Sequence, residues 1–173
     1  MDPLSVITAD VECISYDCTH KLMKTINLHK GYICYFLNVR SIKKHWDEVK
    51  VLNSMLNDGG RVLGCMVAEV SVKSSELHPY RLPGFSLFHK LREKQRGGGV
   101  MFFLREGISA TVVDLEFDES ESIILKIDND STTILLICIY RPPHTNKKDF
   151  LISLEYFLQG RQDKKLFLLV ILT

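Results

Sequence analysis

Apolar residues form short continuous runs and helix-spaced stripes along the first part of the chain. The run YICYFLNV, residues 32–39, is rich in aromatic and branched side chains and predicts a buried strand. Apolar positions three and four apart then run from Ile42 to Leu56, after a candidate N-cap at Ser41 and before the stop NDGG. A second run, RVLGCMVAEV, has a single acid, Glu69, as its last residue but one. This part of the chain predicts a strand, an amphipathic helix and a second strand.

From Gly84 onward, apolar runs follow one another at hairpin-like distances. They are GFSLFHKL, VMFFLRE, ATVVDLEF, SIILKID and TTILLICIY, separated by the turn sequences RGGG, EGIS, DESE and NDS. After the proline pair of RPPHT, Asn146 can cap a second helix, and the last run is LFLLVIL. Strands that are apolar on both faces need cover on both faces. The pattern predicts an α+β fold of two packed sheets, mixed and antiparallel, with helices outside.

Composition narrows the class of protein. The chain has 173 residues and 46% hydrophobic residues, enough for a core, and its 22 basic residues nearly balance 21 acidic ones. Any binding to a polyanion must therefore come from a local patch. The longest apolar stretch is far too short to span a bilayer, so we expect no membrane partner. Residues 1–30 lack a sustained period and no secretory signal is evident; we expect a weakly structured leader before a domain at 31–173. Five cysteines, an odd number, favour free thiols in a reducing compartment.

Two polar residues at strand ends are the first candidates for chemistry. Asn38 ends the first predicted strand, where turn geometry alone would explain it, and Glu69 near the end of the second could be a solvated acid. Parallel neighbours joined by a helix place their C-terminal ends side by side, so both residues would converge on one crevice. Two oxygen ligands of this kind, completed by water and phosphate, suit magnesium.

Other candidates are weaker when taken singly. Tyr140 and Arg141 end a strand at a proline-locked corner, where packing is the ordinary reading and phosphate contact the functional one. RGGG lacks the Lys-Ser/Thr of a phosphate loop and leads into a strand, so a hairpin or bulge is favoured. Cys13, Cys18 and His20 have poor zinc spacing. Several basic residues could form a phosphate-facing rim, although a solvated face explains them equally well: Lys43, Lys44, Arg92, Lys94, Arg96 and Arg105.

Together, the blocks resemble the endonuclease/exonuclease/phosphatase family. They are YFLNVRSIKKHWDEVK, an apolar strand ending in Glu69, LPGFSLFHK, RGGGVMFFLRE, ILLICIYRPP and LFLLVILT. The combination, from about Tyr32 to Thr173, is most similar to the endonuclease domain of non-long-terminal-repeat (non-LTR) retrotransposons, part of their reverse-transcriptase polyprotein. The resemblance implies a four-layer α/β sandwich of the deoxyribonuclease I type, incomplete at its C-terminus.

The resemblance also implies roles for individual residues. Asn38, from N-V-R-S, would lie at the metal and phosphate site, Glu69 would bind the metal, and Tyr140, from Y-R-P-P, would hold the scissile phosphate. The expected catalytic residues are thus Tyr140 and Asn38, and the metal ligands Glu69 and Asn38. The ion would be Mg²⁺ or Mn²⁺, with no small-molecule cofactor, and the partner would be DNA, contacted by Arg40, Arg96 and Arg141. Such a protein would be intracellular and, if functional, would act in the nucleus.

This sequence departs from the family in two ways. The family's E-T-W is here Glu69-Val70-Ser71, and the later G-D-F-N and S-D-H blocks do not occur. In the family, those blocks position the attacking water and stabilise the transition state. We therefore expect a fragment of a magnesium-dependent DNA endonuclease that is inactive alone. Two alternatives stay open: a non-catalytic module that binds nucleic acid or protein, and a phosphatase of the same superfamily.

Overall fold

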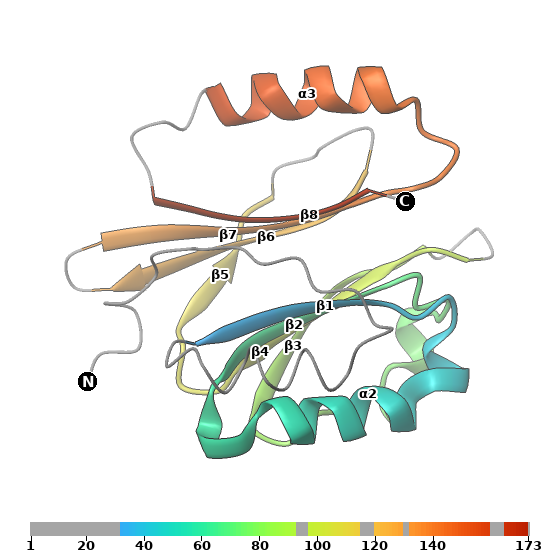
Figure 1. Cartoon of the computed structure of the whole chain (residues 1–173), viewed down its shortest axis with the longest axis vertical. Helices are drawn as coiled ribbons and strands as arrows, with labels where there is room; N and C mark the ends of the chain where they lie inside the picture. The colour runs from blue at the N-terminus through green and yellow to red at the C-terminus, as the bar shows by residue number, and fades with distance from the viewer. Residues whose placement is uncertain (1–31, 93–96, 115–119, 130–131, 160–164, 173) are drawn as a thin grey trace.

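The computed structural model describes residues 32–92, 97–114, 120–129, 132–159 and 165–172 (Figure 1). The expected leader at 1–30 lies outside these residues, as does Arg96. For residues 129, 132 and 165–172 only the backbone is considered.

Sheet A is built from the first half of the chain. Its strand order is β1-β2-β4-β3, with β1 and β2 parallel and the other pairs antiparallel. The parallel pair is joined by α2, as the strand-helix-strand pattern predicts. Short 3-10 turns at Asp58–Gly60 and Ser74–Glu76 lie in the connections that follow α2 and β2. The elements are β1 (Ile33–Asn38), α2 (Ile42–Leu56), β2 (Val62–Ala68), β3 (Phe85–Lys90) and β4 (Val100–Arg105).

Sheet B is built from the second half and has the order β5-β6-β7-β8. The first three strands are antiparallel, and β7 pairs in parallel with β8, again across a helix. The predicted strand LFLLVIL is thus an edge strand of this sheet among the described residues. The elements are β5 (Ala110–Val112), β6 (Glu121–Asn129), β7 (Thr132–Arg141), α3 (Lys147–Gln159) and β8 (Lys165–Leu172).

The two sheets pack face to face, with α2 outside sheet A and α3 outside sheet B (Figure 1). Three apolar layers fill the gaps: α2 against sheet A, sheet A against sheet B, and sheet B against α3. Alternation along each strand supplies them, since Cys65 and Val67 face α2 while Met66 and Ala68 face sheet B. This arrangement confirms the predicted α+β sandwich with four layers.

The two helices begin in different ways. Asn146 caps α3 as predicted, because its Oδ1 accepts a hydrogen bond from the Lys148 amide at 2.9 Å. Ser41 stands at the N-cap position of α2 as predicted, but its hydroxyl makes no capping hydrogen bond. Instead, the amide of Ile42 donates to the carbonyl of Val70 at 3.1 Å. The segment after β2 therefore satisfies the start of α2, and the two ends of the crossover are held together.

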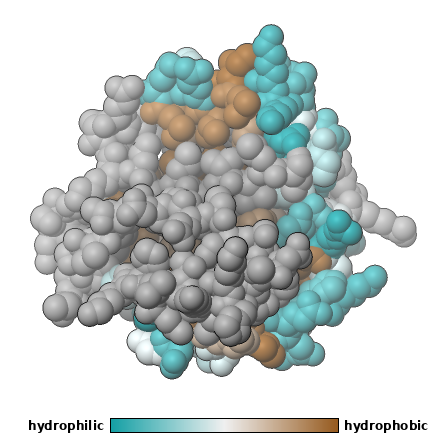
Figure 2. Space-filling model, viewed as in Figure 1, coloured by the Kyte–Doolittle hydropathy of each residue, from teal (hydrophilic) through white to brown (hydrophobic). Residues whose placement is uncertain are grey.

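The outer surface carries a few large apolar side chains. Leu151 and Ile152 on α3 are 43% and 56% exposed, and brown patches lie over this end of the molecule in Figure 2. Among the described residues, no helix has both the length and the apolar character needed to cross a membrane.

Candidate active site

The C-terminal ends of β1 and β2 bring the first two candidates together. Asn38 is paired in register with Ala68, directly before Glu69. The Asn38 side-chain amide donates a 2.9 Å hydrogen bond to Oε1 of Glu69. The strand-helix-strand pattern predicts this meeting, because parallel neighbours end at the same edge of a sheet.

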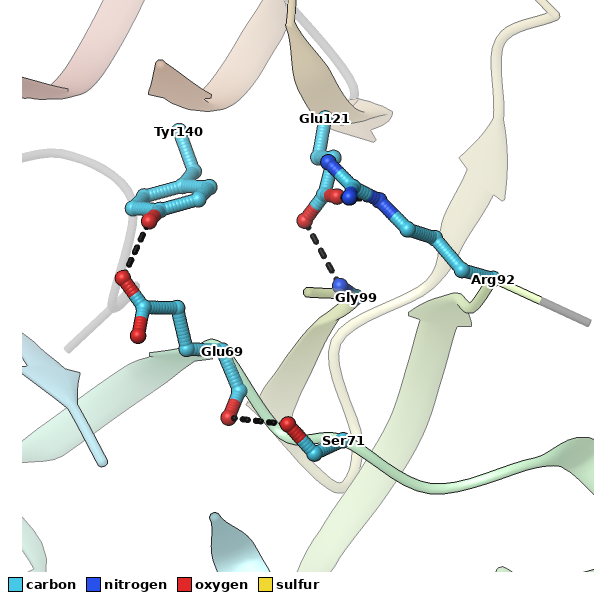
Figure 3. A network of polar contacts seen from close by, with 6 residues as sticks. All are labelled: Glu69, Ser71, Arg92, Gly99, Glu121 and Tyr140. Carbon is cyan, nitrogen blue, oxygen red and sulfur yellow. Dashed lines mark hydrogen bonds and ion pairs between the residues drawn. The ribbon is translucent and has the colours of Figure 1, made fainter. Parts of the chain in front are cut away.

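Tyr140 reaches the same carboxylate from the other sheet. Its side chain is 1% exposed and lies in the apolar layer between the sheets. The phenol hydroxyl donates a hydrogen bond to Oε1 of Glu69 (Figure 3). One carboxylate oxygen of Glu69 therefore accepts donors from both sheets, and all three side chains of the predicted site converge on it.

The backbone around this carboxylate is in an unusual conformation. Arg40, Glu69 and Ser71 have φ angles of 53°, 56° and 54°, the left-handed region that side chains with a Cβ rarely adopt. The Ser71 hydroxyl lies 3.2 Å from the carbonyl of Arg40 and 3.4 Å from that of Glu69, and donates to both. Left-handed backbone costs roughly 1–2 kcal/mol per residue. Among the described residues, the non-glycine positions with this conformation are these three, and such clustering is typical of functional sites.

Of the three predicted phosphate-binding arginines, the structure describes two: Arg40, which follows β1 of sheet A, and Arg141, the last residue of β7 in sheet B. Arg141 follows Tyr140 on one strand, so its side chain leaves the opposite face of sheet B. It is 7% exposed, and its Nη1 donates to the carbonyl of Thr145 at 2.7 Å, which holds the proline corner. Arg40 is exposed beside Asn38, and its amide donates to Asn38 Oδ1 at 3.2 Å. Phosphate contact by any of the three stays a prediction.

Three of the other basic candidates that the structure describes are held by partners within the fold, while Lys94 lies outside the described residues. Lys43 forms an ion pair with Glu76, which raises the pKa of the lysine and lowers that of the acid. Arg105 lies at the far end of sheet A, where its Nε donates to the carbonyl of Val62 at 2.8 Å. Arg92 forms an ion pair with Glu121.

Sequence reasoning missed Glu121 and Ser71. Glu121 stands in DESE, which reads as a turn, yet its side chain is only 10% exposed and its Oε2 accepts the Gly99 amide at 2.7 Å (Figure 3). The one available signal was its position directly before the apolar run SIILKID. Ser71 was read only as a departure from the E-T-W motif.

The donor set suits a hard cation only in part. Glu69 Oε1 already accepts two hydrogen bonds, which leaves Oε2 as the oxygen that could face an ion. Among the described residues, no group of three or more His, Cys, Asp and Glu side chains could hold a metal. A carboxylate and an amide oxygen do match magnesium, which is commonly bound through one or two carboxylates plus substrate phosphate. The residues therefore fit a Mg²⁺ ion that the protein and a substrate phosphate bind together. They do not form a complete coordination shell by themselves.

Comparison with known proteins supports the fold. No protein-family model matches the chain, and no curated protein matches it. The endonuclease domain of TRAS1, a telomere-specific non-LTR retrotransposon, is 12% identical with a TM-score of 0.55, and the match covers 78% of this chain and 56% of that one. The AP endonuclease LMAP from Leishmania major is 17% identical with a TM-score of 0.50, and the match covers 75% and 45%.

A third structure, humanized D. rerio TDP2, is 10% identical with a TM-score of 0.50, and the match covers 72% of this chain and 57% of that one. The chain thus spans about half the length of the structures that it resembles. At these identities the likeness concerns the fold, and it confirms the fold that the sequence predicts.

Proposed function

Because the chain has the deoxyribonuclease I-like fold, we propose that it carries the cation-binding and phosphate-binding part of a magnesium-dependent DNA endonuclease of the non-LTR retrotransposon kind. The observation that carries the proposal is the shared oxygen of Glu69, which accepts bonds from Asn38 and Tyr140 of different sheets. A fold alone would need no such convergence. The left-handed backbone at Glu69 supports the same conclusion, because strained backbone is concentrated at functional sites.

In the proposed reaction, a DNA phosphodiester is hydrolysed at this edge of the sheets. Glu69 and Asn38 would hold Mg²⁺, which when bound stabilises negative charge on the phosphate and leaving oxygen. Asn38 orients the carboxylate through its amide. With substrate bound, the Tyr140 hydroxyl would transfer its one donated hydrogen bond from Glu69 to a phosphate oxygen, and the exposed guanidinium of Arg40 would contact a neighbouring phosphate. If the protein acts on chromosomal DNA, its site of action is the nucleus.

The proposal includes inactivity of the 173 residues on their own. They contain no Gly-Asp-Phe-Asn and no Ser-Asp-His sequence, the blocks that the resemblance assigns to water activation and transition-state stabilisation. Removing one member of a catalytic unit commonly lowers the rate by several powers of ten. We propose binding without measurable cleavage for this chain, and catalysis where those groups are supplied.

Cation binding tests the site directly. Mn²⁺ titration followed by electron paramagnetic resonance would compare the wild-type chain with Glu69→Gln and with the control Glu48→Gln, an exposed acid on α2. We expect the Glu69 variant to bind Mn²⁺ at least tenfold more weakly and the control to bind it as wild type does. Equal affinity in all three proteins would overturn the assignment of Glu69.

DNA binding and cleavage are tested separately. Fluorescence anisotropy with a short duplex should show salt-dependent binding that Mg²⁺ strengthens in wild type but not in Glu69→Gln. Supercoiled plasmid incubated with Mg²⁺ should stay intact. Nicking by wild type that disappears in Glu69→Ala would contradict the proposed inactivity while supporting the site.

A further inference from the structure

The glycine-rich sequence at Gly97–Gly99 is used in the structure as a bridge between the sheets. The Gly99 amide donates to Oε2 of Glu121 on β6 at 2.7 Å. On its other side, the Gly99 carbonyl accepts the Val70 amide at 3.2 Å, and the Gly98 carbonyl accepts the Ser71 amide at 2.9 Å. The carboxylate of Glu121 is therefore linked through two glycines to the two residues that follow Glu69.

The glycines are required by close approach. A Cβ on Gly98 would lie 2.5 Å from Oε1 of Glu121 and 2.6 Å from Nε of Arg92. Gly98 and Gly99 also have φ angles of 74° and 83°, which favour glycine. These constraints account for glycine at positions 98 and 99 without a phosphate-binding role. The loop is shaped to let its backbone reach a buried carboxylate.

Glu121 also lies next to Tyr140. The two residues are directly paired across β6 and β7, so their side chains leave the same face of sheet B, toward sheet A. The Glu121 side chain is only 10% exposed and its charge is compensated by Arg92, whose side chain is 26% exposed. A buried carboxylate needs such a partner.

We propose that Glu121, paired with Arg92, is a positioning residue that fixes the hydrogen bond between Tyr140 and Glu69. Glu121 stands beside Tyr140 on one sheet and fixes, through Gly98 and Gly99, the backbone that follows Glu69 on the other. It touches neither the proposed cation nor the proposed phosphate. This inference rests on the proposed function only where it gives the Tyr140–Glu69 hydrogen bond a role in binding. Whether Glu121 positions that bond can be tested without measuring activity.

The alternative role is a structural staple that joins the sheets and has no influence on the site. Both roles predict some loss of stability when the ion pair is removed. They differ in the hydrogen bond of the Tyr140 phenol, since only a positioning role moves the phenol signal toward the position it has when the Glu69 acceptor is removed. A direct observation of that phenol therefore separates the two roles.

The experiment uses the full chain labelled with ¹³Cζ-tyrosine. The chain has six tyrosines, and loss of one signal in Tyr140→Phe assigns the resonance. We expect Glu121→Gln to move the Tyr140 signal toward its position in Glu69→Gln, and Arg92→Met to move it in the same direction. Arg92→Lys, which keeps the charge, should restore most of the wild-type shift.

The matched control is Arg105→Gln, which removes a side-chain anchor at the opposite end of sheet A. It should lower the thermal midpoint without moving the Tyr140 signal. If Glu121→Gln does not fold, Arg92→Met decides, because the arginine is the more exposed partner. A Tyr140 signal that stays unchanged in folded variants of both Glu121 and Arg92 would overturn the positioning role.

Mn²⁺ titration of the same variants separates this inference from the proposed function. We expect Glu121→Gln to weaken Mn²⁺ binding about tenfold, the effect of losing a group that orients a ligand. A wild-type chain that binds no Mn²⁺, combined with a moved Tyr140 signal, would remove the proposed function and leave the positioning role. Mn²⁺ binding by the wild-type chain, combined with an unmoved Tyr140 signal in the variants, would support the proposed function and remove the positioning role.

Discussion

The two ends of sheet A are both held by polar side chains, yet they are built differently. At the far end, Arg105 donates to the carbonyl of Val62 at 2.8 Å and to Oδ1 of Asn57 at 2.5 Å. The same Oδ1 accepts the Val62 amide at 3.1 Å. At the site end, Glu69 gathers Asn38 and Tyr140 on a backbone in the left-handed region.

The difference shows where the fold is stabilised and where it stores strain. Asn57 has φ −86° and ends α2, so its interactions at the far end need no unusual backbone. At the site end, three neighbouring positions hold conformations that sterics disfavour. The strain at that end must be offset by contacts elsewhere, among them those of Arg105. Substitutions at the far end should therefore change stability, and substitutions at the site end should change binding.

The largest expected effect concerns the ionisation of two cysteine thiols on β1 and β2, between the two ends of sheet A. Burial raises the pKa of the Cys34 thiol from 9.0 to about 12, and that of Cys65 likewise. At pH 8 the native thiolate population should then be about 1,000-fold lower than in the unfolded chain. Site-resolved alkylation with iodoacetamide, compared with the same reaction in urea, measures this protection.

The same shifts give stability a pH dependence. The unfolded chain releases these thiol protons near pH 9, whereas the folded chain retains them to about pH 12. The folded state thus binds more protons in this window, and stability decreases as the pH rises through it. Fast alkylation of the native protein at pH 8 would contradict the prediction that burial keeps these two thiols protonated.

The next effect is the loss of the far-end anchor. Arg105→Ala removes charge-assisted hydrogen bonds to Val62 and Asn57 and a contact of the guanidinium with the Phe85 ring at 5.4 Å. Hydrogen bonds to charged groups contribute about 1.5–3 kcal/mol, so we expect a loss of about 3 kcal/mol in urea unfolding. Lys44→Ala on the exposed face of α2 is the control and should change stability by less than about 0.5 kcal/mol.

Binding at the site separates this prediction from a general loss of structure. In conditions where Arg105→Ala is folded, its Mn²⁺ affinity should equal that of wild type. A large change in affinity without unfolding would mean that the two ends are coupled, and the comparison between them would fail.

How much of this arrangement the sequence predicts depends on the distance between partners. The helix between β1 and β2 fixes the two strands as parallel neighbours, so the meeting of Asn38 and Glu69 is predictable from local pattern. The opposite directions of Tyr140 and Arg141 also follow from strand alternation, a signal that was available and not applied. The contact between Glu121 and Gly99 joins residues 22 positions apart, one at the start of β6 and the other directly before β4. The hydrophobic periodicity of the sequence does not predict such a contact, and the polar sequence DESE is typical of a turn.

A smaller effect is expected at Gly64 on β2, which lies beside the Phe102 ring of the neighbouring strand β4. A Cβ on Gly64 would lie 2.4 Å from Cζ of Phe102, so Gly64→Ala overpacks the layer between the sheets. Overpacking costs about 1–3 kcal/mol, measurable by urea unfolding. The double variant with Phe102→Leu should recover part of the loss, and strictly additive effects would mean that the ring is not the obstacle.

The smallest effect has the opposite sign. Arg40 has φ 53° and an exposed side chain, and its contact to Asn38 Oδ1 uses only the backbone amide. Relief of left-handed backbone gains roughly 1–2 kcal/mol, and the added freedom of glycine in the unfolded chain returns roughly 0.5–1 kcal/mol. Arg40→Gly should therefore stabilise the protein by about 0.5 kcal/mol in urea unfolding, while DNA affinity falls and its salt dependence weakens by about one phosphate contact. Arg40→Ala is the matched control: it should lose the same DNA contact without the gain in stability, because its Cβ keeps the strain. Equal stability of the glycine and alanine variants would show that the left-handed backbone at Arg40 is unstrained, and the contrast between the two ends of sheet A would then rest on Glu69 and Ser71.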